Sequence, residues 1–195
     1  MTAPSPAQLE ASLSIAEGLV AAIRAEQWTA PTPCSEWDVR ALVGHVVSGN
    51  QLFADLLDGA TTLEEFRRTA PGDVLGDRPV PAFHDAAQAL LAAFRLPGAL
   101  DRPVTVPFGT VPGAVALHLR LTEILVHGWD LARATGQPVH FDDALIEQEF
   151  QFGSQALTQL PPGRTPFAAS SDVPVDAPAL DRLAALLGRD VAALG

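Results

Sequence analysis

An acid and a histidine stand four residues apart inside an apolar stretch that reads LHLRLTEILVHGWDLARATG, from Leu117 to Gly136. At about 100° per residue, this spacing places Glu123 and His127 on the same face of a helix. A carboxylate and an imidazole within an apolar stripe need a partner, because burying them unpaired is unfavourable. That partner is either a divalent metal ion or an ordinary Glu–His hydrogen bond, and this stretch by itself leaves both open.

The composition favours a single globular domain over residues 1–195, because 48 % of the residues are apolar and can form a substantial core. The apolar runs are too short for a bilayer span. The N-terminal sequence MTAPSPAQLE lacks the pattern of a secretion signal, so we expect a cytoplasmic location. The net charge of −11 argues against nucleic acid and anionic membranes as partners.

The number of cysteines limits the kind of metal site that the chain can form. Cys34 is the single cysteine, so a zinc site built on several cysteines is excluded. We expect Cys34 to be a lone small hydrophobic side chain or an incidental thiol. Any metal ligands must therefore be carboxylates and histidines. Three of the histidines are weaker candidates, because one lies on the helix face opposite His127 and the other two are expected at the surface: His118, His84 and His140.

Hydrophobic periodicity predicts an all-α fold. Long helices are expected over residues 7–25, 39–57, 81–94, 113–136 and 144–160, with short helices over 62–70 and 179–187. Ser35 followed by Asp38 is typical of a capping box at the start of the second helix. Residues 104–109 alternate and predict a short hairpin or extended arm. We predict a four-helix bundle with extra short helices and this arm, with its core at about 6–160 and a C-terminal extension at about 161–195.

His45 lies on the apolar face of the second predicted helix. In a bundle, side chains on facing helices converge, so His45 can meet Glu123 and His127. Two histidines and one carboxylate form a ligand set for catalytic zinc, and the same set suits iron or nickel. The alternative for His45 is a core histidine bonded to a backbone carbonyl. Asp130 is placed either to orient His127 or to pair with Arg133 or Arg40.

Three segments carry a family resemblance: TPCSEWDVRALVGHVV at 32–47, VPGAVALHLRLTEILVHGWDLARATG at 111–136, and DRLAALLGRD at 181–190. They resemble the mycothiol-dependent maleylpyruvate isomerase N-terminal-like family, within the DinB-like group of helical-bundle metalloproteins. This resemblance implies a DinB-like four-helix bundle and a metal ion held by His45, Glu123 and His127. We expect zinc, with nickel and iron as alternatives.

The resemblance also implies a low-molecular-weight thiol such as mycothiol as cofactor and an electrophilic substrate. The isomerase that names the family carries a separate C-terminal domain, and few residues follow the ligand helix here. We therefore expect a single-domain relative, not the isomerase itself.

Three hypotheses follow for the function. The chain is a metalloenzyme that activates a small thiol, as a thiol S-transferase or a thiol-dependent isomerase-like enzyme, or it is a metal- or small-ligand-binding module without turnover. In the third hypothesis the protein is metal-free and the Glu123–His127 pair is structural. The sequence leaves open the substrate, the turnover and whether the chain forms a homodimer.

Overall fold

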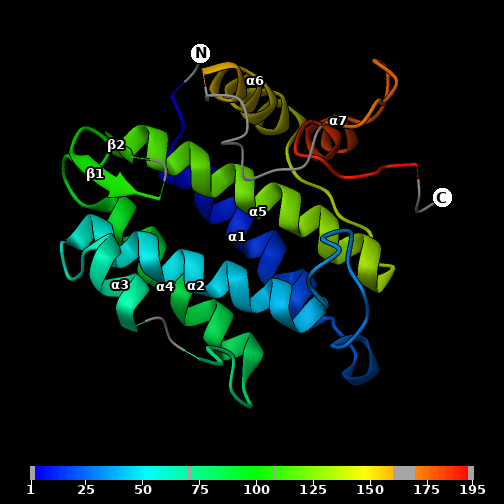
Figure 1. Cartoon of the computed structure of the whole chain (residues 1–195), viewed down its shortest axis with the longest axis horizontal. Coiled ribbons are helices and arrows are strands. Elements are labelled where there is room, and N and C mark those ends of the chain that lie inside the picture. The colour runs from blue at the N-terminus through cyan, green and yellow to red at the C-terminus, as the bar shows by residue number, and fades with distance from the viewer. Residues whose placement is uncertain (1–2, 70–71, 108, 160–169, 193–195) are drawn as a thin grey trace.

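The fold is built on a four-helix bundle. The computed structural model describes residues 3–69, 72–107, 109–159 and 170–192. The bundle helices are α1 (Pro6–Ala21), α2 (Val39–Asp58), α4 (Pro79–Arg95) and α5 (Gly113–Thr135). Helices α1 and α2 each pack against both α4 and α5, so α2 and α5 are neighbours in the bundle. Figure 1 shows how these helices are arranged. The all-α prediction is confirmed.

The ends of α1 and α2 follow local signals in the sequence. Ser5 and Gln8 form a capping box at the start of α1. The carboxylate of Asp38 accepts a hydrogen bond from the Ala41 N–H at 2.8 Å and so caps α2. The predicted box with Ser35 is wrong, because Asp38 itself is the N-cap. Helix α2 ends at Gly59, whose φ of 74° lies in the left-handed region.

Helix α5 is the most enclosed element of the bundle. A Cβ at Gly113 would overlap the carbonyl oxygen of Ala99, so only glycine allows this start. The helix ends where Gly136 adopts a φ of 68°. Most of its side chains are buried, including the polar residues Arg120, His127 and Asp130. The helix predicted from the apolar stretch is therefore confirmed, and it carries several charges into the core.

The remaining elements pack outside the bundle. They are η1 (Ala25–Gln27), α3 (Leu63–Thr69), β1 (Pro103–Val106), β2 (Gly109–Pro112), α6 (Asp143–Gln159) and α7 (Ala179–Leu186). The two strands form the predicted hairpin, in antiparallel register. Helices α6 and α7 pack on each other and on α5 (Figure 1). The described part of the predicted C-terminal extension thus packs on the bundle, while Leu160 and the first part of the predicted connector, residues 163–169, lie outside the described residues.

One continuous hydrophobic core joins the bundle helices with residues of α6 and α7. Within the described ranges, no helix is long and apolar enough to cross a membrane.

Candidate metal centre

Three side chains predicted as ligands converge at the seam between α2 and α5. His45 Nε2 lies 3.0 Å from Glu123 Oε2, and His127 Nε2 lies 3.2 Å from the same oxygen. Glu123 and His127 share a face of α5 through their spacing of four residues. The packing of α2 against α5 brings His45 to them. His45 therefore faces a carboxylate, and the alternative of a bond to a backbone carbonyl is wrong.

Acceptors stand on both sides of the His127 ring. Its Nδ1 lies 3.0 Å from Asp130 Oδ2, while its Nε2 faces Glu123. Because a neutral imidazole donates from only one nitrogen, the second nitrogen can approach a carboxylate only through a proton or a metal ion. Burial lowers the pKa of His127, but hydrogen bonds with Asp130, Cys34 and Glu123 outweigh it and raise that pKa well above its ordinary value. These contacts favour a positive charge at this point, carried by a second proton on the ring or by a metal ion.

Glu123 is ionised in this arrangement. Burial raises its pKa, but hydrogen bonds with His127 and His45 dominate and hold the pKa well below its ordinary value. The site therefore offers one carboxylate oxygen and two imidazole nitrogens around a common point. These three ligand atoms lie within 4.8 Å of one another, so the donor set fits a divalent ion.

The loop before α2 brings two more residues to the site. The Thr32 hydroxyl donates to the Trp37 carbonyl at 2.8 Å and accepts the Cys34 N–H at 3.1 Å, which folds residues 32–37 into a compact turn. The Trp37 ring centroid then lies 4.4 Å from that of His45 and 5.8 Å from that of His127. Trp37 therefore packs against the core and also lies against the two histidines.

Asp130 links the candidate centre to the C-terminal part of the chain. Arg189 donates from Nη2 to Asp130 Oδ2 at 2.8 Å and from Nε to Oδ1 at 3.2 Å. Gly188, with a φ of 83°, ends α7 in a Schellman motif, because the Arg189 N–H bonds the Ala184 carbonyl. This reversal of the chain directs Arg189 toward α5.

The partners of Asp130 decide between the roles predicted for it. Asp130 contacts the Nδ1 of His127 at 3.0 Å, which is the position that the first of these roles needs. The alternative ion pairs are wrong, because Arg133 pairs with Asp181 and Arg40 with Asp73. Burial raises the pKa of Asp130, but hydrogen bonds with His127 and Arg189 lower it below its ordinary value. The carboxylate is therefore a buried anion between two cationic groups.

Sequence reasoning missed three residues near the centre: Cys34, Arg120 and Arg189. The Cys34 sulfur lies 3.4 Å from Asp130 Oδ2, so this thiol is part of a polar cluster and the prediction of an apolar role is wrong. Arg189 lies in a segment that carries the family resemblance, but the local pattern does not indicate that it reaches the site. The pattern indicates only that Gly188 can end α7, because glycine readily adopts a positive φ.

Arg120 is a buried cation one turn before Glu123. Its Nη2 donates to Asn50 Oδ1 at 2.7 Å, and its guanidinium carbon lies 5.2 Å from the Phe53 ring centroid. A Cβ at Gly49 would lie 2.7 Å from Arg120 Nη1, so the glycine makes room for the guanidinium. Burial lowers the pKa of Arg120, yet the group remains a cation near neutral pH. Its charge in turn helps to lower the pKa of Glu123.

The other histidines lie away from this centre. His118 is buried and its Nδ1 lies 2.9 Å from Glu149 Oε1 on α6, so it belongs to a separate pair. His84 is half-exposed beside Glu17, and His140 is exposed, as predicted.

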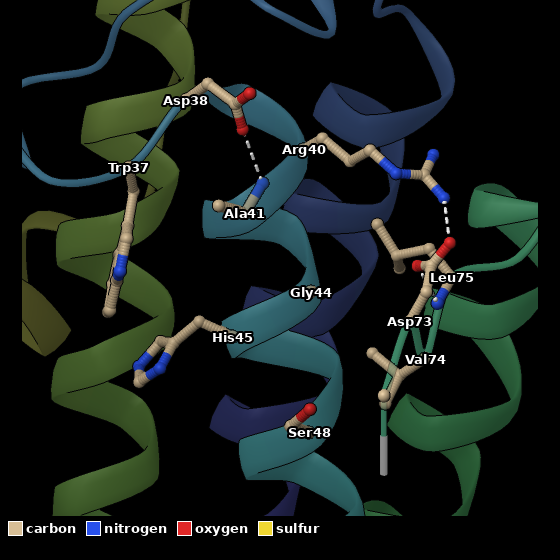
Figure 2. Close-up of a pocket in the computed structure, with 11 residues that line it drawn as sticks. Trp37, Asp38, Arg40, Ala41, Gly44, His45, Ser48, Asp73, Val74 and Leu75 are labelled. Carbon is tan, nitrogen blue, oxygen red and sulfur yellow. Dashed lines mark hydrogen bonds and ion pairs between the residues drawn. The ribbon is translucent and has the colours of Figure 1, made fainter.

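A pocket of about 480 Å³ opens beside His45. In Figure 2, the rings of Trp37 and His45 lie on one side of α2, and the ion pair of Arg40 with Asp73 lies on the other. Gly44 lies between them and adds no side chain to the pocket. The pocket thus offers an aromatic wall, the Arg40–Asp73 ion pair and direct access to one candidate ligand.

Fold and site together define a helical bundle with a His–Glu–His cluster between two of its helices. A sequence comparison identifies the family: residues 9–132 match the mycothiol maleylpyruvate isomerase N-terminal domain, and the chain belongs to this family. Uncharacterized proteins of Mycobacterium tuberculosis, from strains CDC 1551 / Oshkosh and ATCC 25618 / H37Rv, are each 38 % identical over 176 residues. Each match covers 89 % of this chain and 91 % of the relative.

Solved structures of similar fold include the mycothiol-dependent maleylpyruvate isomerase and a variant of it in which a histidine is replaced by alanine. Each superposes with a TM-score of 0.59 at 16 % identity, over 77 % of this chain and 70 % of that chain. At this identity the comparison establishes a common fold.

Proposed function

We propose that this chain binds one divalent metal ion through His45, Glu123 and His127 and uses it to activate a small thiol. The observation that carries the proposal is the convergence of two imidazoles on one carboxylate oxygen, at 3.0 and 3.2 Å. When bound, such an ion lowers the pKa of a coordinated thiol or water and so supplies a nucleophile at neutral pH. Zinc is the expected ion, because borderline-soft zinc accepts nitrogen, oxygen and sulfur ligands.

The protein's own residues have defined roles in this proposal. Glu123 remains ionised and neutralises part of the ion's charge. Asp130 accepts the Nδ1 proton of His127, which fixes the tautomer that presents Nε2 to the ion. Trp37 lies against both imidazoles and restricts how their rings can turn. These groups preorganise the site before any substrate arrives.

The pocket beside His45 is the proposed entry for the reactants. Its Trp37 wall suits a flat or apolar group. Mycothiol is the proposed thiol, because the family takes its name from a mycothiol enzyme, and an electrophile is the proposed second substrate. The reaction class is thiol transfer or thiol-dependent isomerisation, and the alternative is a metal- or ligand-binding module without turnover. The cytoplasmic location and a homodimer stay predictions.

Elemental analysis of protein purified without a nickel column tests the metal site. We expect about one divalent ion per chain in the wild type. Most of it should be lost in His45→Ala and in His127→Ala, because each variant removes one of only three protein ligands. His84→Ala is the matched control, since His84 lies at the surface with Glu17. Full metal content in both site variants would refute the assignment.

Thiol-transfer assays then separate an enzyme from a binding module. Metal-loaded protein is incubated with a small thiol and an electrophile, and conjugate formation is compared with that of metal-stripped protein. Turnover that requires the metal and His127 supports the enzyme. Metal binding without turnover on a panel of electrophiles supports the binding module.

A further inference from the structure

A second set of metal-ligand atoms lies on the other side of the His127 ring. It consists of Cys34 Sγ, His127 Nδ1 and an Asp130 carboxylate oxygen, all within 4.8 Å of one another. His127 Nδ1 is 3.0 Å from Asp130 Oδ2, and Cys34 Sγ is 3.4 Å from the same oxygen. A tetrahedral zinc ion with bonds of about 2.0 Å to N and O and 2.3 Å to S separates its ligand atoms by about 3.3–3.5 Å. The spacing in the protein is close to this.

A cation already occupies this set. The Nη2 of Arg189 lies 2.8 Å from Asp130 Oδ2 and 3.0 Å from Cys34 Sγ. The arginine side chain is 8 % exposed, and Asp130 is fully buried. Its position is fixed by the Schellman turn after α7 and by a bond from Nη1 to the Leu187 carbonyl at 2.9 Å. A metal ion and a guanidinium cannot share the same two ligands, because their charges repel at such short distances.

We propose that Cys34, His127 and Asp130 form a second site for a borderline-soft divalent ion, and that Arg189 keeps this site closed. The arginine acts as a built-in cation that satisfies Asp130 and covers the thiol. It thereby leaves His127 Nε2, on the Glu123 side, as the nitrogen available to a metal. When the guanidinium is removed, an ion binds Cys34 as a thiolate, and the thiol proton and the Nδ1 proton of His127 pass to solvent.

Cobalt(II) titration of Arg189→Met tests this proposal, because a cobalt–thiolate bond gives a sulfur-to-metal charge-transfer band. Methionine preserves an apolar stem while removing the charge. Without added thiol, we expect no band in the wild type, a band in Arg189→Met, and none in Arg189→Met combined with Cys34→Ser. Arg182→Met is the matched control, since Arg182 on α7 pairs with Glu147 outside the cluster.

Arg189→Gln is the second variant, because its amide still donates to Asp130 while carrying no charge. A folded neutral variant without the band overturns the proposal, as does a band in the wild type. Loss of the fold in both variants also overturns it, because Arg189 would then be required by the fold itself.

This second site rests on the proposed metal-binding function, and the experiments distinguish a failure of one site from a failure of the other. A wild type that binds no metal, with a Cys34-dependent band in Arg189→Met, refutes the first site and supports the second. A wild type that binds one ion, with no band in Arg189→Met, supports the first site and refutes the second.

Discussion

The Nδ1 of His127 lies 3.0 Å from Asp130 Oδ2, on the side of the ring opposite Glu123. This contact fixes which nitrogen of His127 faces the α2–α5 seam, and it connects the candidate ligand to the Arg189 ion pair. The positioning of one imidazole therefore depends on a residue that follows the last helix of the described chain.

Asp130→Asn should weaken the binding of zinc by about 10- to 100-fold, because asparagine is a poorer acceptor for the Nδ1 proton and orients His127 less firmly. Competition with a chromophoric chelator measures the affinity. Asp181→Asn is the matched control, since Asp181 accepts the Trp129 Nε1–H on another side of α5. Equal zinc affinities for Asp130→Asn and Asp181→Asn would show that Asp130 does not support metal binding.

Zinc affinity should depend on pH. The pKa of His127 is raised in the metal-free protein, so a proton competes with the ion for this histidine below that pKa. Affinity should increase roughly tenfold per pH unit as this one proton is lost, and level off once pH exceeds the raised pKa. Calorimetry in two buffers of different ionisation enthalpy measures the proton released. Zinc binding without proton release below this pKa would show that the ion does not displace a proton from His127.

Removal of the metal should lower the melting temperature and preserve the helical circular-dichroism signal. The bundle has a continuous hydrophobic core, so it folds without the ion. A ligand present at about 100 times its dissociation constant stabilises a protein by roughly 2.7 kcal/mol. An unfolded metal-free protein would be incompatible with this expectation, and so would an unchanged melting curve.

The cobalt-substituted protein should develop a sulfur-to-metal band when a small thiol is added. Two neutral imidazoles and one carboxylate leave a divalent ion with a net positive charge, which favours an anionic thiolate. The band should be absent in His127→Ala and should persist in Cys34→Ser, because Arg189 holds Cys34 on the other side of the ring. An unchanged spectrum at saturating thiol would favour water activation or simple binding.

Gly49→Ala should destabilise the protein by about 1–3 kcal/mol, the usual range for overpacking a core. The new Cβ would lie 2.7 Å from Arg120 Nη1 and would displace this buried guanidinium. Gly18→Ala is the control, because nothing lies within 4 Å of its Cβ and alanine is the better helix former, by about 0.5–1 kcal/mol. Urea unfolding measures both. Similar stability changes in the two variants would show that Arg120 moves aside freely.

The sequence by itself determined relations within single elements. The spacing of Glu123 and His127 put them on one face of α5, because helical hydrogen bonding fixes the angle between successive residues. Gly59 and Gly136 ended their helices where predicted, since both adopt a left-handed conformation that other residues avoid. The family motifs led to the same three candidate ligands, with His45 in one motif and Glu123 and His127 in another.

The tertiary structure alone decided which elements meet. His45 reaches Glu123 across 78 residues of sequence, and Arg189 reaches Asp130 across 59. No local rule encodes such contacts, because they depend on how the whole core packs and on where the Schellman turn after α7 directs the chain. For the same reason Cys34 looked like a lone apolar residue in the sequence, and only the folded loop before α2 places its sulfur between Asp130 and Arg189.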